Sequence, residues 1–249
     1  MKSVVMILGM HRSGTSCLTG SLQQMGLFLG EVFTENPFNL KGNRENGRIM
    51  NLNNALLERN GGAWCSPPAT IEWDDSHCQE RADIIHDMVD ASGGAVWGFK
   101  DPRCLFTFPF WVEGFDDVQL VGTFRHPVSV AQSLYFRNQI PLDEGFALWC
   151  AYNERLLDLL QRYRFPLVSF DVDADQYLAS VKRVAAYLGL RGGPDEDHTF
   201  FEESLRKQRE YSAEPVPDEC RALYQALQEF TADFQLPHIN RGDAIPDCH

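Results

Sequence analysis

The fold is decided by Val4-Val-Met-Ile-Leu-Gly9 and the residues that follow it, Met10-His-Arg-Ser-Gly-Thr-Ser16. A short apolar run that ends at a glycine predicts a strand buried on both faces of a sheet. The next apolar side chains recur at helical spacing and predict a helix over residues 14–25. Glycines between a strand and a helix let backbone N–H groups and the positive end of the helix dipole face one point. The sequence therefore predicts an anion-binding turn here, with a purely structural glycine turn as the alternative.

The glycine spacing of this turn is that of a P-loop, but its charge is placed differently. A P-loop has lysine after the second glycine, where this chain has Thr15, and the cation stands three residues earlier, at Arg12. A kinase also needs a carboxylate at a strand end to hold Mg²⁺. Asp101 and Asp171 are candidates for that role, so an ATP- and Mg²⁺-dependent kinase is a second hypothesis.

The rest of the chain alternates between strand and helix patterns. Further strands are predicted at residues 95–100, 118–124 and 167–170. Helices are predicted at residues 44–59, 78–92, 143–163, 175–188, 199–210 and 217–234, and from Pro127 onward. Residues 28–43, rich in Gly, Asn and Pro, are predicted to form a long loop. This alternation predicts an α/β fold, a three-layer parallel sheet with helices on both faces, in a single domain over residues 1–249.

A second anion-binding element follows the third predicted strand. The strand runs directly into Arg125-His-Pro127, and Ser133 lies eight residues after the arginine. Ser129 and Ser133 are four residues apart, on one face of the helix that Pro127 begins. A strand-end arginine and hydroxyl groups on the next helix can share one phosphate.

Together the two elements resemble the sulfotransferases that use 3′-phosphoadenosine-5′-phosphosulfate (PAPS). The segment Gly9–Ser16 is similar to their 5′-phosphosulfate loop in its Arg-Ser-Gly-Thr form, and Arg125 with Ser133 is similar to their 3′-phosphate site. The resemblance implies a P-loop NTPase-like sulfotransferase fold, PAPS as donor, 3′-phosphoadenosine-5′-phosphate (PAP) as product, and no metal. The cofactor-binding residues it implies are Arg12, Ser13, Gly14, Thr15, Ser16, Arg125 and Ser133.

Other segments are similar to features of bacterial polysaccharide-type members of this family: Asn36-Pro37 with Gly42–Asn46, Lys100–Arg103, Leu148–Asn153 and Tyr187–Leu190. Phe200–Leu205 resembles a loop segment that closes over the nucleotide. The resemblance implies nucleotide-binding elements at residues 4–27 and 95–140, an acceptor-side segment at 28–75 and a C-terminal helical portion at 191–249. It implies as acceptor a hydroxyl group of a glycan, a glycolipid or a small-molecule natural product.

Sulfuryl transfer needs an aligned acceptor, a stabilised charge and a group that removes the acceptor proton. The resemblance implies Glu45 as this base; the alternative is a carboxylate that stabilises a helix N-terminus. Glu31, Glu35 and Asp101 are the other carboxylates considered.

Two further residues are catalytic candidates. His11 is predicted either to line the sulfate pocket or to hydrogen-bond the backbone. Lys100 and Arg103 flank a turn after a strand, where active-site residues of open α/β sheets gather. Lys100 is predicted to reach the sulfuryl group or the acceptor; the alternative is that both basic groups pair with nearby acids such as Asp101 on the surface. Trp64, Trp73 and Trp97 are predicted to stack on adenine or a sugar, or else to lie in the core.

Composition limits the remaining possibilities. A formal net charge of −13 argues against nucleic acid as a partner. The seven cysteines stand singly and predict reduced thiols, and no metal-ligand spacing is present. No stretch has the length of a membrane span or the form of a signal peptide, which predicts a cytoplasmic protein. A non-catalytic nucleotide-binding protein is the third hypothesis, and the oligomeric state stays open.

Overall fold

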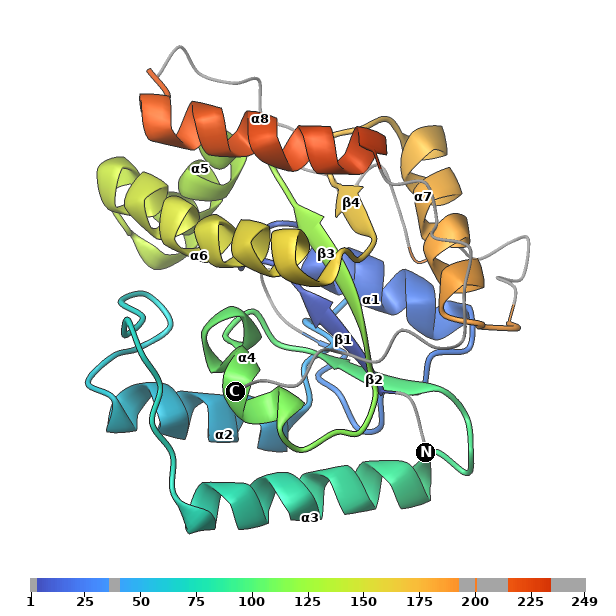
Figure 1. Cartoon of the computed structure of the whole chain (residues 1–249). Helices are drawn as coiled ribbons and strands as arrows, with labels where there is room; N and C mark the ends of the chain where they lie inside the picture. The colour runs from blue at the N-terminus through green and yellow to red at the C-terminus, as the bar shows by residue number, and fades with distance from the viewer. Residues whose placement is uncertain (1–3, 36–40, 193–199, 201–214, 234–249) are drawn as a thin grey trace.

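The computed structural model describes residues 4–35, 41–192, 200 and 215–233, and its centre is a sheet of four parallel strands. The strands are β1 (Val4–Leu8), β2 (Trp97–Lys100), β3 (Val118–Phe124) and β4 (Leu167–Ser169), in the order β2-β1-β3-β4 (Figure 1). Val4 pairs with Trp97 on one side and with Val118 on the other. The predicted α/β fold with a parallel sheet is confirmed.

Eight helices surround the sheet in the described part of the chain. They are α1 (Thr15–Gln24), α2 (Gly47–Arg59), α3 (Asp75–Ala91), α4 (Cys104–Val112), α5 (Pro127–Asn138), α6 (Leu142–Tyr163), α7 (Ala174–Tyr187) and α8 (Asp218–Asp233). Side chains cap the starts of four of them: Asn46 caps α2, Asp74 caps α3, His126 caps α5 and Asp173 caps α7. The helix predicted at 199–210 lies, except for Phe200, outside the described residues. Judged by length and hydropathy, every described helix falls short of a bilayer span.

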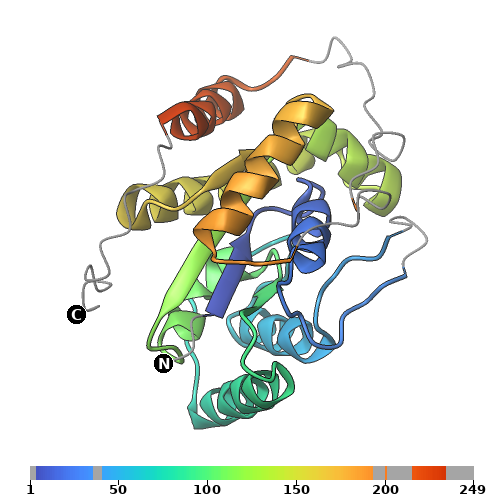
Figure 2. The ribbon, with the colours of Figure 1, turned by 90° about the vertical axis from the view of Figure 1, so that its right-hand side faces the viewer.

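Helices cover both faces of the sheet, as the sequence predicts. Val5 and Ile7 of β1 pack against α1 and α7, which lie together on one face (Figure 2). The alternate residues Val4, Met6 and Leu8 belong to the larger core on the other face, to which α2, α3, α4, α5, α6 and α8 contribute. Because its side chains alternate between the two faces, β1 lies between the two cores and contributes to both.

The helix α4 was not predicted from the sequence. Its residues, Cys104–Val112, are almost all apolar, and Pro109 lies within it. A helix that is buried on all sides shows no amphipathic stripe, and an internal proline argues against a helix. Tertiary burial overrides both signals.

A buried amide connects α2 to α4. Asn53 Oδ1 accepts hydrogen bonds from Thr107 Oγ1 at 2.7 Å and from Trp111 Nε1 at 2.8 Å. Asn53 is fully buried, so no water replaces it as an acceptor.

We predict that Asn53→Ala lowers the free energy of unfolding by about 2–4 kcal/mol, because each buried donor left without an acceptor costs about 1–3 kcal/mol. Urea denaturation measures the change. Asn51→Ala, on the exposed side of the same helix, is the matched control and should stay within about 0.5 kcal/mol of the parent. Equal stability of the two variants would contradict the role of Asn53.

Candidate active site

The turn between β1 and α1 is held close to the sheet by its glycines. Gly9 and Gly14 have φ values of +151° and +86°, and a Cβ atom on Gly14 would lie 2.3 Å from the ring of Phe170. No side chain caps α1, and its first turn holds no acid. The first N–H groups of the helix therefore lack a side-chain acceptor, and an anion can bind there.

The hydroxyl groups of this turn have different partners. Ser13 Oγ is buried and has no hydrogen-bond partner among the described residues, so it has a donor to offer. Ser16 Oγ instead donates to Asn43 O at 2.9 Å. The backbone N–H of Ser16 can therefore bind an anion, while its hydroxyl holds the backbone at Asn43.

Arg12 joins the two anion-binding elements that the sequence predicts separately. Its Nε donates to Ser133 Oγ at 2.8 Å, across 121 positions of the chain. Ser133 lies on α5, which begins at Pro127 directly after Arg125 and His126. The first predicted element and the serine of the second are thus in direct contact.

A third arginine, which the sequence analysis did not identify, belongs to this group. Burial, and then the positive charges of Arg137 and Arg125, lower the pKa of Arg12 to about 10. Arg137 lies on α5 one turn after Ser133, so its four-residue spacing from Ser133 was the available signal. Guanidinium groups that repel one another are stabilised when an anion binds among them.

Arg125 forms an ion pair with the carboxylate of Asp171. Its Nε lies 3.9 Å from Asp171 Oδ1, while the other oxygen, Oδ2, accepts from His126 N at 2.6 Å and from the Tyr224 hydroxyl at 3.0 Å. Burial raises the pKa of Asp171, although these hydrogen bonds and the charge of Arg125 oppose the rise. Tyr224 comes from α8, and no sequence motif pointed to it.

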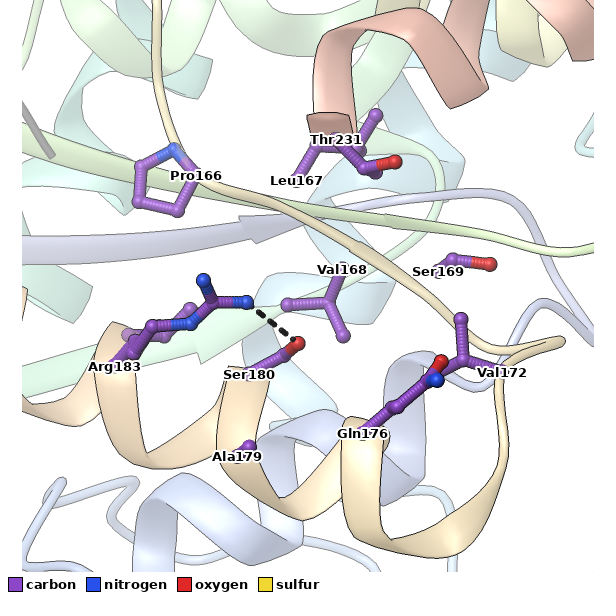
Figure 3. Close-up of a pocket in the computed structure, with 11 residues that line it drawn as sticks. Pro166, Leu167, Val168, Ser169, Val172, Gln176, Ala179, Ser180, Arg183 and Thr231 are labelled. Atoms are coloured by element: carbon purple, nitrogen blue, oxygen red, sulfur yellow. Dashed lines mark hydrogen bonds between the residues drawn. The ribbon is translucent and has the colours of Figure 1, made fainter. Parts of the chain in front are cut away.

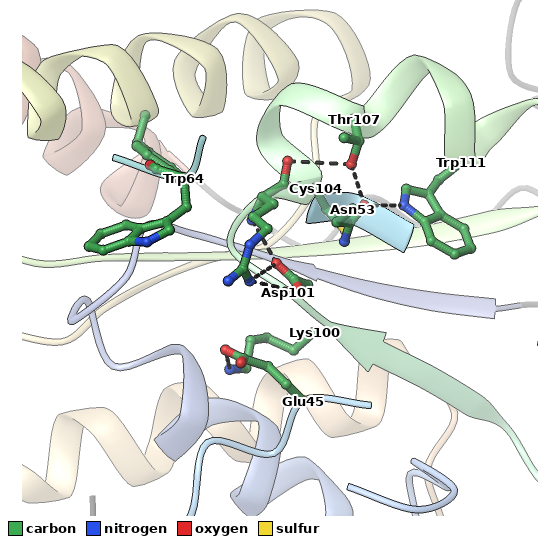
Figure 4. A network of polar contacts seen from close by, with 10 residues as sticks. Glu45, Asn53, Trp64, Lys100, Asp101, Cys104, Thr107 and Trp111 are labelled. Carbon is green, nitrogen blue, oxygen red and sulfur yellow. Dashed lines mark hydrogen bonds and ion pairs between the residues drawn. The ribbon is translucent and has the colours of Figure 1, made fainter. Parts of the chain in front are cut away.

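The predicted catalytic residues Glu45 and Lys100 form a buried ion pair. Lys100 Nζ lies 2.7 Å from Glu45 Oε1, and the two side chains are 1% and 9% exposed (Figure 4). Lys100 ends β2, whereas Glu45 immediately precedes the α2 cap. Asn46 caps the helix with its side chain, and Glu45 lies one residue before this cap, paired with Lys100. Glu31 and Glu35 are exposed.

Asp101 and Arg103 form a second buried pair, which corrects the expectation of a surface contact. Arg103 Nη1 donates to Asp101 Oδ1 at 2.9 Å and to Oδ2 at 3.1 Å. Both residues are buried. A surface pairing was wrong because α4, which was not predicted, begins directly after Arg103 and covers this turn.

His11 is held neutral in the same region. Burial, followed by the charges of nearby Arg103, Lys100, Arg137 and Arg12, lowers its pKa well below the ordinary value. Its Nε2 is buried with no hydrogen-bond partner among the described residues. A neutral imidazole with an open nitrogen can accept a hydrogen bond or a proton.

Of the three tryptophans considered, only Trp64 is shown beside these groups. Its ring centroid lies 4.9 Å from that of His11. Trp97 is in the core, and Trp73 packs edge-on against Phe110. These two positions fit the core alternative.

Several predicted elements lie outside the described residues: Asn36-Pro37, residues 38–40 and residues 201–205. Phe200 is described, and its ring faces Lys41 and the guanidinium of Arg44 at 5.0 and 4.9 Å. A Cβ on Gly20 of α1 would collide with this ring. The aromatic side chain therefore lies against the helix that follows the anion-binding turn.

A cavity of about 530 Å³ lies between β4, α7 and Thr231 of α8 (Figure 3). Its polar groups include Ser180 and Arg183, which hydrogen-bond to each other at 3.2 Å. None of the site residues predicted from the sequence lines it. The cavity is therefore not the candidate active site.

The architecture is that of sulfotransferase domains. A sulfotransferase domain from the curacin biosynthetic pathway is 14% identical, with a TM-score of 0.53, over 92% of this chain and 98% of that one. A domain of the Synechococcus PCC 7002 olefin synthase is 17% identical, with a TM-score of 0.49, over 96% and 90%. A Mycobacterium tuberculosis H37Rv sulfotransferase is 14% identical, with a TM-score of 0.45, over 94% and 77%. No protein-family model and no curated protein matches the chain. The likeness to the curacin-pathway domain shows a shared fold.

We predict that acid destabilises the fold through His11. Because the folded pKa is below the ordinary 6.5, the unfolded chain binds the proton first as the pH falls. The free energy of unfolding then decreases below about pH 6.5, by up to about 1.4 kcal/mol per pH unit, and this contribution is constant above it. Urea denaturation at about pH 7.5, 6 and 5 measures the slope.

His11→Gln should flatten this dependence, whereas His86→Gln, at a histidine whose side chain is 74% exposed, should not. Equal slopes for the two variants would contradict the assignment.

Proposed function

We propose that the chain is a sulfotransferase that moves a sulfuryl group from PAPS to a hydroxyl group of a glycan, a glycolipid or a small natural product. The hydrogen bond between Arg12 and Ser133 is the observation that carries the proposal. In this contact, a residue that we assign to the 5′-phosphosulfate touches a residue that we assign to the 3′-phosphate. The shared fold agrees with this assignment.

The residues present suit the two ends of such a nucleotide. The uncapped start of α1, the orphaned Ser13 hydroxyl and Arg12 offer donors to a 5′-phosphosulfate, with the backbone of Gly14, Thr15 and Ser16. Arg125 and Ser133 are assigned to the 3′-phosphate, and Arg137 adds a third cation. Charge-assisted hydrogen bonds of this kind are the strong ones.

PAPS, when bound, supplies a sulfuryl group on a phosphate leaving group. The chain's part is to hold that group in line with the acceptor and to stabilise charge on the leaving oxygen. Lys100 and Arg12 are the cations proposed to stabilise this charge. Glu45 is proposed to take the acceptor proton, and His11 lines the pocket as a neutral hydrogen-bond acceptor.

The kinase hypothesis is weakened because both carboxylates that could hold Mg²⁺ already have partners in the protein. Asp101 is occupied by Arg103, and Asp171 accepts hydrogen bonds from His126 and Tyr224. Either carboxylate would have to leave these partners to bind Mg²⁺.

We expect PAP to bind tightly in calorimetric titration without metal, and ATP with Mg²⁺ to bind weakly. Arg12→Ala and Arg125→Ala should each weaken PAP binding by about 10- to 150-fold, since a hydrogen bond to a charged group contributes about 1.5–3 kcal/mol. Arg59→Ala is the control, because Arg59 forms a surface ion pair with Asp74.

Tight binding of ATP with Mg²⁺ and none of PAP would favour the kinase instead. Unchanged PAP affinity in both arginine variants would refute the two-phosphate assignment.

We predict that Glu45→Gln slows product formation by about 100-fold or more, which is the usual contribution of a general base. Its PAP affinity should stay within about twofold of the parent, since Glu45 is assigned to the acceptor side. Release of PAP from PAPS with phenolic and sugar hydroxyl acceptors measures turnover.

Glu31→Gln, at an exposed carboxylate, is the control and should keep full turnover. A normal rate in Glu45→Gln would place the base elsewhere. PAP binding without turnover on any acceptor, in the parent protein, would favour the non-catalytic hypothesis.

A further inference from the structure

Two cysteines that are far apart in the sequence meet between α6 and α8. Cys150 Sγ and Cys220 Sγ are 2.7 Å apart, and both residues are buried. This separation lies between the length of a disulfide bond, about 2.05 Å, and a van der Waals contact, which is about 3.5–4.0 Å even for carbon atoms. Neither cysteine belongs to the anion site or to the predicted catalytic residues.

The two thiols are not equivalent. Cys220 lies in the first turn of α8, where the helix dipole favours a thiolate. The hydrogen bond with Cys150 also lowers the pKa of Cys220, although burial and the charges of Glu219 and Glu154 oppose this. Cys220 is therefore the better nucleophile of the pair.

We propose that Cys150 and Cys220 form a reversible disulfide that fastens α8 to α6, with a small disulfide such as glutathione disulfide as the oxidant. The Cys220 thiolate attacks one sulfur of glutathione disulfide and releases one glutathione thiolate. Cys150 then loses its proton and attacks Cys220 in this mixed disulfide, which releases the second glutathione. Two protein thiols are oxidised, one glutathione disulfide is reduced, and the protons pass to the two glutathione thiolates.

The burial of both sulfurs sets the route of access. The oxidant reaches Cys220 when the start of α8 opens locally, as helix ends do. Once closed, the disulfide is protected by the same packing. Reduction then requires the same opening, so the exchange is slow and reversible.

The cross-link also bears on the anion site, a consequence that rests on the proposed function. Tyr224, one turn after Cys220 on α8, donates to Asp171, which lies against Arg125. Fastening α8 keeps this hydrogen bond in place, and so holds the carboxylate that orients the arginine of the proposed 3′-phosphate site.

Disulfide mapping of the full chain tests the chemistry. The protein is equilibrated with reduced or oxidised glutathione, quenched with acid, alkylated in urea and digested without reductant. We expect a peptide that joins Cys150 to Cys220 in the oxidised sample only. Cys65→Ser, which removes an exposed cysteine, should keep it, and Cys220→Ser should abolish it. Full alkylation of both thiols after oxidation, or glutathione bound to each, would overturn the proposal.

The consequence for binding is tested in the Cys65→Ser background. We expect oxidation to raise the affinity for PAP relative to adenosine 5′-monophosphate by about two- to tenfold, the range of one hydrogen bond. Adenosine 5′-monophosphate lacks the 3′-phosphate, so a general loosening of the fold would weaken both ligands equally. A disulfide that leaves the ratio unchanged would refute the link to Arg125. Absence of PAP binding in either form would refute the proposed function and leave the mapped disulfide standing.

Discussion

The parallel pairing of β1 with both β2 and β3 is the constraint on which the candidate site depends. Parallel strands end at the same edge of a sheet, so the residues after each strand meet there. At this edge lie the turn after Leu8, Lys100 at the end of β2 with the segment that follows it, and Arg125. Glycine at position 9 keeps the turn against β3, where a Cβ would lie 2.5 Å from Thr123 O. The contact between Arg12 and Ser133 follows from this arrangement and needs no long-range signal of its own.

The second constraint is the cost of burying charge at this edge. Lys100 with Glu45, and Arg103 with Asp101, are removed from water as pairs, because an isolated buried ion costs several kcal/mol. Nearer the turn, burial and then the positive charges of Arg137 and Arg125 lower the pKa of Arg12, while Arg125 itself lies 3.9 Å from Asp171. Lys100 and Arg103 are thus neutralised by their partners, and three arginines, Arg12, Arg125 and Arg137, gather near the anion-binding turn. A chain with a net charge of −13 can attract a small anion through such a local field.

How far the sequence predicts this structure depends on the range of the interactions. The strand and turn at residues 4–16, and Arg125 with Ser133, are set by local patterns, and the structure brings Arg12 to Ser133. The helix α4 was missed because burial on all sides removes its amphipathic pattern. The contacts of Asp171 with Tyr224 join residues 53 positions apart, and nothing local specifies them. Glu45 and Lys100 were both named from the sequence, but their pairing depends on the path of the chain before α2.

In the proposed reaction, the pairing of Glu45 with Lys100 links the proposed base to the cation that stabilises the developing charge. A proton on His11 would add positive charge beside Arg103, Lys100, Arg137 and Arg12, which already lower its pKa. A proton on Glu45 also makes the site more positive, because it removes the negative charge that neutralises Lys100. The lysine then carries an uncompensated charge in a buried site, at the moment when negative charge develops on the leaving oxygen. Proton uptake by Glu45 and charge stabilisation by Lys100 would thus be coupled through their 2.7 Å contact, which agrees with the roles proposed for the two residues.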